Sequence, residues 1–206
     1  MAAEPSAFSI TTSAAEYRRY LLGNAEGEML DVAKLIPGLV LDLRFATAQT
    51  LLGRPLYARA RALLRRPVAE ALQRVQATLS GWGLGLCLYD AYHPYSLTTE
   101  LMCPPDKLVD PPWSHLPHTR GCAVGVGLIE LASQRPLPLP TDFHEYQPAT
   151  HSGYGQLPAH VLFNRSMLLA AMKQQGFANY PGEWWHYAHQ RWADFSPLDI
   201  SFEELG

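Results

Sequence analysis

Two distant parts of the sequence carry residue types that together could activate a water molecule. Glu183 and His186 are three residues apart in the stretch EWWH, and His118 lies 65 residues before Glu183. Neutral imidazole is a good zinc ligand, and a nearby glutamate that does not bind the metal can accept a proton from water. These residues form a candidate hydrolytic centre, although eight histidines in the chain make the pairing alone weak evidence.

The stretch after His118 alternates large and small residues. Residues 123–128 read AVGVGL, so in a strand the valines and the leucine would share one face and leave the other face nearly bare. Glycine weakens a strand and usually marks a bulge or a close approach by another part of the chain. We therefore expect something to pack against the bare face, which contains Gly125 and Gly127.

Hydrophobic periodicity predicts the elements that hold these residues. Alternation predicts strands at 39–44, 84–88 and 123–128, and helical spacing predicts helices at 67–79 and near 160–175, the second ended by Gly176. Proline-rich stretches at 103–117 and 135–140 are expected to be loops. Since neither a repeat nor a linker is present, this order predicts an α+β fold: one compact domain over residues 1–206 with a central, mainly antiparallel sheet flanked by helices.

The composition excludes some classes of function. The chain is 48% hydrophobic and 17% charged, with a formal net charge of −3, which is ordinary for a globular protein and argues against a nucleic-acid partner. One basic run is expected to be a solvated face rather than a binding patch. It consists of Arg59, Arg61, Arg65 and Arg66.

The cysteines and the N-terminus indicate a cellular compartment. Cys87, Cys103 and Cys122 form neither a CxxC pair nor an even set, which favours free thiols in a reducing compartment. The N-terminus lacks the charged start and apolar stretch of a signal peptide, and the sequence has no apolar run of about 18 residues. We therefore expect a cytoplasmic protein with no membrane partner.

Four motifs in order carry a family resemblance. YDAYHP, HTRGCAVG, TDF and EWWH, at their separations here, resemble the D-alanyl-D-alanine dipeptidase family of zinc peptidases, whose pattern is DxYRP, SxHxxGxAxD, a later Asp and ExWH. The similarity runs from about residue 40 to residue 192. The resemblance implies a cytoplasmic enzyme that cleaves the D-Ala-D-Ala dipeptide with zinc as its cofactor.

The resemblance also implies residue roles by position. His118 and His186 would be zinc ligands and Glu183 the general base. Asp142 would bind the ammonium group of the substrate, and Asp90 would support the substrate pocket. The expected partner is a small dipeptide or an amino-acid-like ligand.

Three positions depart from the family's pattern. Gly125 stands where the family has an aspartate as its third zinc ligand, and Leu116 replaces a serine. His93 replaces the arginine that stabilises the developing oxyanion, and so remains a candidate catalytic residue although it is shorter and not bidentate. Because a catalytic zinc usually has three protein ligands, two histidines would hold zinc weakly, and Gly125→Asp is expected to raise the affinity.

Several alternatives stay open at this stage. His115, His144 or Glu145 could supply the missing ligand. The chain could be a zinc dipeptidase with a rebuilt ligand set, a catalytically impaired relative that keeps the pocket, or a protein whose pocket serves another reaction on an amino-acid-like molecule. Cys122 is expected to be a small core residue rather than a nucleophile. Packing beneath the site is expected for the two tryptophans of EWWH rather than stacking on substrate.

Overall fold

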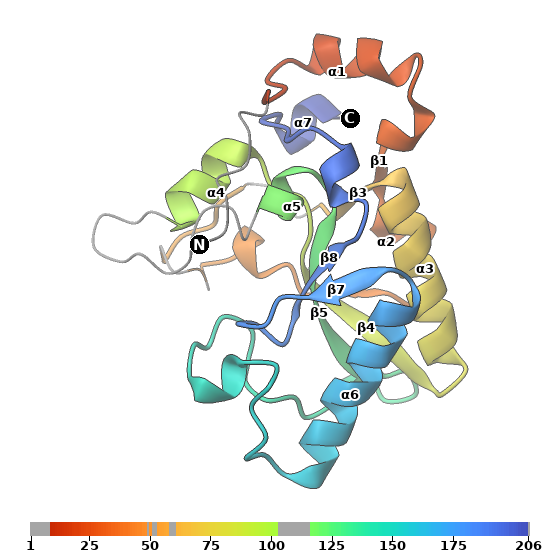
Figure 1. The fold of residues 1–206 in the computed structure, drawn as a ribbon, viewed down its shortest axis with the longest axis vertical. Coiled ribbons are helices and arrows are strands. Elements are labelled where there is room, and N and C mark those ends of the chain that lie inside the picture. The colour runs from red at the N-terminus through yellow and green to blue at the C-terminus, as the bar shows by residue number, and fades with distance from the viewer. Residues whose placement is uncertain (1–8, 49, 51–52, 58–60, 103–115, 206) are drawn as a thin grey trace.

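The computed structural model describes residues 9–48, 50, 53–57, 61–102 and 116–205 (Figure 1). The helices are α1 Ala14–Leu21, α2 Val32–Leu35, α3 Arg66–Ser80, α4 Tyr95–Met102, α5 Leu116–Thr119, α6 Ala159–Gln174 and α7 Phe202–Leu205. The strands are β1 Met29–Asp31, β2 Val40–Leu41, β3 Leu63–Arg65, β4 Leu84–Asp90, β5 Ala123–Glu130, β6 Arg135–Pro136, β7 Phe177–Asn179 and β8 His186–His189. The predicted helices and strands are therefore present, although the first strand pairs over only two of its residues. Arg59, Cys103 and His115 lie outside the described residues.

A six-stranded sheet organises the molecule. Its order is β2-β4-β5-β8-β7, and β6 adds to one end of β5. Every pairing is antiparallel except that of β2 with β4. The prediction of an α+β fold with a mainly antiparallel central sheet is confirmed. The short antiparallel pair of β1 and β3 lies outside this sheet.

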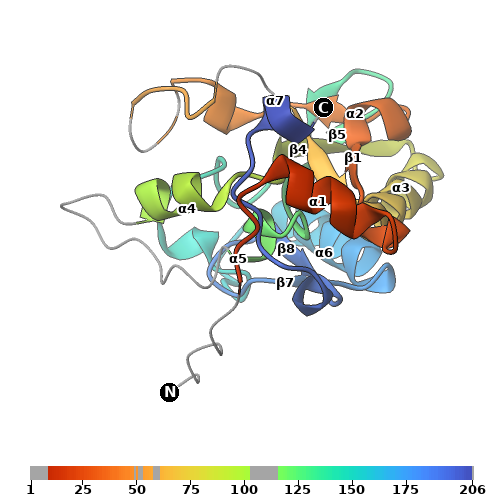
Figure 2. The ribbon, with the colours of Figure 1, turned by 90° about the horizontal axis from the view of Figure 1, so that it is seen from above.

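Helices α3 and α6 contact each other and cover one side of the sheet, whereas α4 lies on the opposite side of the molecule (Figures 1 and 2). Helix α3 begins with proline in its first turn and buries one apolar stripe completely. That stripe consists of Val68, Leu72, Val75 and Leu79. Helix α6 ends as expected, because Gly176, the residue after the C-cap Gln175, has a positive φ of 82° that few other residues adopt.

The two faces of β5 differ as the alternation predicts. Val124, Val126 and Leu128 are fully buried in the main core. The bare face is covered by Tyr89 and Phe143, whose rings stack with centroids 5.1 Å apart. A Cβ at Gly127 would overlap the Tyr89 ring, and a Cβ at Gly125 would lie 3.0 Å from Phe143 Cε2. Glycine is needed at position 127, and position 125 is tightly packed, because two aromatic rings lie directly on the strand.

The prediction of a solvated basic run is wrong for Arg65. This side chain is only 1% exposed, and its guanidinium donates hydrogen bonds to the carbonyl oxygens of Arg120, Gly27 and Ser196. Arg65 therefore joins three segments of the chain from inside the protein. Among the described residues, no helix is both long and apolar enough to cross a membrane.

Candidate metal and catalytic site

The strand register places three residues in one row across the sheet. Asp90 at the end of β4 is opposite Gly125 of β5, and Gly125 is in turn opposite His186 at the start of β8. The register between β4 and β5 shifts between Leu88 and Asp90, which is a β-bulge. By simple alternation Asp90 would share the core face with Leu88, so the bulge is what turns its carboxylate to the other face.

His118 reaches the same place from the short helix α5. Gly121 links α5 to β5 with a positive φ of 69°, and a Cβ there would lie 2.6 Å from the Met29 side chain. The turn therefore requires glycine for both its conformation and its close packing. His118 Nδ1 donates to the carbonyl oxygen of Ala91 at 2.7 Å, which fixes the proton on Nδ1 and leaves a lone pair on Nε2.

The three central imidazoles lie close together. The ring centroids of His118 and His186 are 4.8 Å apart, and those of His93 and His118 are 5.2 Å apart with nearly parallel planes. All three side chains are at most 3% exposed. The structure thus brings together the two predicted zinc ligands and the histidine at the oxyanion position.

Glu183 lies next to these rings in the turn before β8. The Asn179 side chain donates to the carbonyl oxygens of Glu183 and His186, each at 2.9 Å, and so holds the turn. Glu183 is 1% exposed, and its Oε2 accepts a hydrogen bond from His186 Nδ1 at 3.0 Å. Its other oxygen, Oε1, accepts one from the Tyr146 hydroxyl at 2.9 Å. Both oxygens of this buried carboxylate are therefore held.

Asp90 is the buried anion of the site. Its Oδ2 lies 3.2 Å from His118 Nδ1 and 3.5 Å from His93 Nε2, and its Oδ1 accepts from the amide of Ala91. Burial alone would raise the pKa of Asp90, but the imidazoles of His118 and His93 outweigh it and lower that pKa to about 2. Burial lowers the pKa of His118 to about 3, so this ring is neutral near neutral pH, as a metal ligand must be.

One group of side chains has the donors and the spacing for a metal ion. Donor atoms of Asp90, His93 and His118 all lie within 4.8 Å of one another, and all three residues are buried. Two imidazoles and a carboxylate are ligands that zinc commonly takes. In addition, His93 Nε2 is buried and lies 3.5 Å from Asp90 Oδ2, longer than an ordinary hydrogen bond. These side chains therefore fit a metal ion.

His144 borders the site without joining this donor group. Its φ is 61°, an uncommon value for a histidine. The ring stacks on Phe143 at 4.2 Å and meets the edge of Phe45 at 5.0 Å. Burial lowers the pKa of His144, and its charged neighbours include Glu183 and Asp90. His144 is thus an uncharged wall of the site near neutral pH.

Asp142 lies at the exposed edge of the site. Its side chain is 63% exposed, and both carboxylate oxygens are 3.4 Å from the guanidinium of Arg44. The segment is tied to the EWWH turn because Trp184 Nε1 donates to Thr141 Oγ1 at 2.9 Å. A ligand at the edge of the site would meet this carboxylate from the solvent side.

The similarity of this chain to known protein families shows the family to which it belongs. The chain matches the Peptidase M15 family, described as D-ala-D-ala dipeptidase, over residues 25–194. The chain belongs to the D-Ala-D-Ala dipeptidase family.

Three members of the dipeptidase family illustrate the degree of similarity. A D-alanyl-D-alanine dipeptidase of Escherichia coli is 29% identical over 177 residues, covering 85% of this chain and 91% of that protein. Proteins with the same description from Enterococcus faecalis and Streptomyces coelicolor are each 26% identical. They cover 79% and 78% of this chain, and each match spans 91% of the relative.

Sequence reasoning missed two residues of this dipeptidase-family site. Tyr146 contacts Glu183 and Thr98 contacts His93, but in neither case does the sequence spacing indicate the contact.

Two further expectations concern Cys122 and the tryptophans of EWWH. Cys122 is fully buried, and burial raises the pKa of its thiol to about 12, so it is a core residue as expected. Trp184 and Trp185 are each 1% exposed, which agrees with packing beneath the site.

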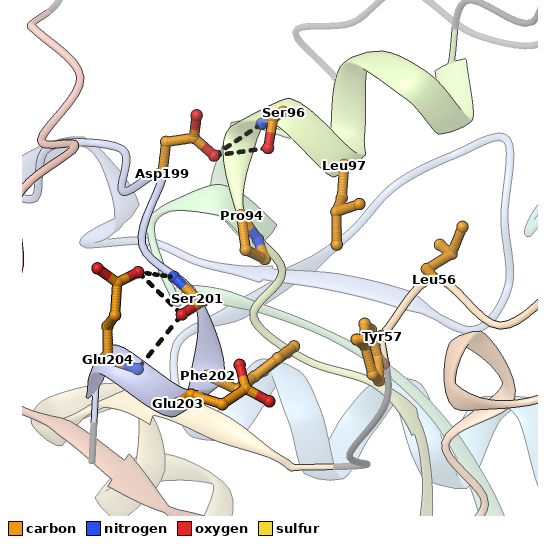
Figure 3. A pocket seen from close by; sticks show the side chains of 10 residues that line it. All are labelled: Leu56, Tyr57, Pro94, Ser96, Leu97, Asp199, Ser201, Phe202, Glu203 and Glu204. Carbon is orange, nitrogen blue, oxygen red and sulfur yellow. Dashed lines mark hydrogen bonds between the residues drawn. The ribbon is translucent and has the colours of Figure 1, made fainter.

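Two cavities lie near the dipeptidase-family site. One of about 670 Å³ is lined by Tyr146, Gln147, Pro148, Thr150, His151, Gly153, Tyr154 and Gly182, and so adjoins Glu183 through Tyr146 and Gly182. The other, of about 490 Å³, lies beside α4 and the C-terminal segment, and neither cavity is lined by a predicted site residue (Figure 3). Two of its three carboxylates accept hydrogen bonds from nearby serines, Asp199 from Ser96 at the start of α4 and Glu204 from Ser201. The first cavity is the one that adjoins Glu183, because its lining residue Tyr146 donates a hydrogen bond to that carboxylate.

Proposed function

We propose that the protein is a zinc-dependent hydrolase that cleaves D-Ala-D-Ala or a related small D,D-dipeptide. The observation that carries the proposal is the buried Glu183 carboxylate, hydrogen-bonded at 3.0 Å to Nδ1 of His186, whose ring centroid lies 4.8 Å from that of His118. This is a proton acceptor placed directly next to imidazoles that suit a metal. Family membership agrees with this arrangement.

The residue roles follow from the contacts. His118 is oriented by the Ala91 carbonyl so that Nε2 is available to the metal, and His186 is oriented through Glu183. Glu183 accepts the proton of the attacking water and returns it to the leaving amine. Zinc, when bound, polarises the substrate carbonyl and increases the acidity of water.

Asp142 gives the site a preference for a free amine. Its exposed carboxylate attracts the ammonium group of a dipeptide, while Arg44 on its other side fixes its orientation. The cavity lined by Tyr146 and Gly182 lies next to Glu183 and has room for a small ligand. Asp90, buried behind the imidazoles, supports the pocket by holding His118.

A second candidate is a relative of the dipeptidases with impaired or redirected activity. The observation that favours it is Gly125, since the position of the family's third ligand carries no side chain and faces Phe143. Leu116 in place of serine and His93 in place of arginine add to the difference. Such a protein would keep a pocket for an amino-acid-like ligand while cleaving the dipeptide slowly or not at all.

One experiment separates the two candidates. The purified protein is loaded with zinc, its metal content is measured, and D-Ala-D-Ala cleavage is assayed beside the Glu183→Gln variant. The hydrolase predicts cleavage by the unaltered chain and loss of cleavage in Glu183→Gln with metal content unchanged, because the glutamate acts on water rather than on the ion. Zinc-loaded protein that never cleaves D,D-dipeptides would reject the hydrolase and favour the redirected pocket.

A further inference from the structure

An aromatic ring borders the position of the missing aspartate. A Cβ at Gly125 would lie 3.0 Å from Phe143 Cε2 and 3.4 Å from Asp90 Cβ. A side chain at this position would therefore require Phe143 to shift by a few tenths of an ångström. A third metal ligand for this chain must come from another segment.

The adjacent strand provides that segment. The β-bulge before Asp90 turns the end of β4 toward the face of Gly125, and the chain continues directly to His93. His93 is fully buried, and its Nε2 lies 3.5 Å from Asp90 Oδ2. Donor atoms of Asp90, His93 and His118 fall within 4.8 Å of one another. No other group of this kind is found in the described part of the chain.

The two nitrogens of His93 have different surroundings. Nδ1 is joined to Thr98 Oγ1 by a hydrogen bond of 2.8 Å, whereas the buried Nε2 lies 3.5 Å from Asp90 Oδ2, longer than an ordinary hydrogen bond. Buried polar atoms usually have closer partners than this. If Nδ1 donates to Thr98, the Nε2 lone pair faces the donor group, which is the usual arrangement for a metal-ligating histidine.

We propose that His93 is a metal ligand that takes the place of the carboxylate missing at Gly125. The proposal rests on the proposed function only in taking the family's zinc as the occupant. The proposal links two departures from the family's pattern. Position 125 lacks a negatively charged aspartate and position 93 lacks a positively charged arginine, so together the two changes leave the formal charge of the site unchanged. His93 then acts on the metal rather than as a replacement oxyanion donor.

His144 is the competing candidate for the additional ligand. Its Nδ1 is also buried without a hydrogen-bond partner among the described side chains. However, its ring is enclosed by aromatic rings, namely Phe45, Phe143, Tyr146 and Trp185. Neither His144 nor His186 belongs to the donor group of Asp90, His93 and His118, so the aromatic enclosure is what separates His144 from His93. The geometry thus favours His93.

Metal affinity, measured without any assay of activity, tests the proposal. Zinc is titrated into the full chain in competition with a coloured chelator, and Co²⁺ absorption reports the ligand set. His93→Gln, which retains a group able to bond Thr98, should lower zinc affinity by more than about 100-fold and change the Co²⁺ spectrum, since even outer-shell changes cost roughly 10–100-fold. Thr98→Val should lower affinity by roughly 10-fold, because it removes only the anchor.

The controls distinguish a ligand from a structural histidine. His160→Gln removes an exposed imidazole from α6 and should leave affinity unchanged. Unfolding temperature, measured on every variant, separates a lost ligand from a lost fold. Unchanged zinc affinity and an unchanged Co²⁺ spectrum in folded His93→Gln would overturn the proposal. A large loss of zinc affinity in His144→Gln, with no loss in His93→Gln, would also overturn it.

The metal-binding test and the dipeptide-cleavage test can fail independently of each other. Dipeptide cleavage with metal affinity independent of His93 would overturn this inference and leave the hydrolase in place. Metal binding that depends on His93 without any cleavage would support this inference and reject the hydrolase. Failure of the unaltered chain to bind zinc or Co²⁺ would overturn the inference directly.

Discussion

The Tyr146 hydroxyl donates a 2.9 Å hydrogen bond to Glu183 Oε1, while His186 Nδ1 binds the other oxygen of the same carboxylate. The two donors come from different parts of the chain, the loop before Pro148 and the start of β8. Because Glu183 is almost completely buried, these contacts fix where its carboxylate points and compensate for its lost hydration. Tyr146 is therefore a positioning residue for the proposed base.

Tyr146→Phe removes the hydroxyl and keeps the ring. We expect kcat for dipeptide cleavage to fall about 10- to 100-fold, since a hydrogen bond to a charged group contributes about 1.5–3 kcal/mol. Zinc affinity should stay unchanged, and the pH profile of kcat should shift because the carboxylate loses a donor. Tyr154→Phe is the matched control, since Tyr154 lines the same cavity and its hydroxyl contacts Gln156. Equal kcat in Tyr146→Phe and the unaltered protein would contradict this role.

Gly125→Asp restores the family's residue but meets Phe143. The sequence alone predicted a gain in zinc affinity, but the close contact with Phe143 changes this expectation. The single substitution should lower the free energy of unfolding by about 1–3 kcal/mol, the usual cost of overpacking a core, with little gain in zinc affinity. The double variant Gly125→Asp with Phe143→Ala should bind zinc more tightly than Phe143→Ala alone, because the ring no longer occupies the space of the carboxylate. Chelator competition and urea unfolding measure both effects. A stable single variant with strongly increased affinity would show that Phe143 moves aside without cost.

Asp142→Asn tests recognition of the free amine. The substitution keeps the shape and removes the charge, so KM for dipeptides should rise about 10- to 100-fold, as expected for losing a charge-assisted hydrogen bond. N-acetylated dipeptides, which carry no ammonium group, should show equal kcat/KM with both proteins. A similar rise in KM for both kinds of substrate would instead indicate a structural role for the contact between Asp142 and Arg44.

The buried histidines make the metal-free protein sensitive to acid. Burial lowers the pKa of His118 to about 3, below the value of about 6.5 for an exposed histidine, so the unfolded chain binds the proton first as pH falls. The contribution of the neutral buried ring to the free energy of unfolding is complete above about pH 6.5 and is lost progressively toward pH 3. The free energy of unfolding then falls with a slope approaching about 1.4 kcal/mol per pH unit for each such histidine. His144, whose pKa is also lowered by burial, adds in the same direction.

Urea unfolding with chelator present, at several pH values below 7, measures this slope. His118→Gln should reduce it, and His160→Gln on the exposed side of α6 should not. A free energy of unfolding that does not change between about pH 6.5 and 4.5 would contradict the expectation of neutral buried rings.

The sequence by itself determined the elements and the candidate residues. The apolar stripe of α3 and the alternation in β5 are local patterns, since side chains repeat every 3.6 residues in a helix and every two in a strand. The ordered motifs around His118, Asp142 and Glu183 likewise identified the family before any contact was known. The glycines of β5 predicted a close approach, and the structure contains one.

Only the tertiary structure decided which groups meet. The bulge before Asp90 reverses the face that alternation assigns to it, and bulges depend on pairing with β5 rather than on local sequence. In the same way Arg65 is buried because three distant carbonyl groups converge on it, and Tyr146 reaches Glu183 across 37 residues. The sequence shows that Gly125 has no side chain, but the register of three strands decides that Phe143, Asp90 and His186 surround it.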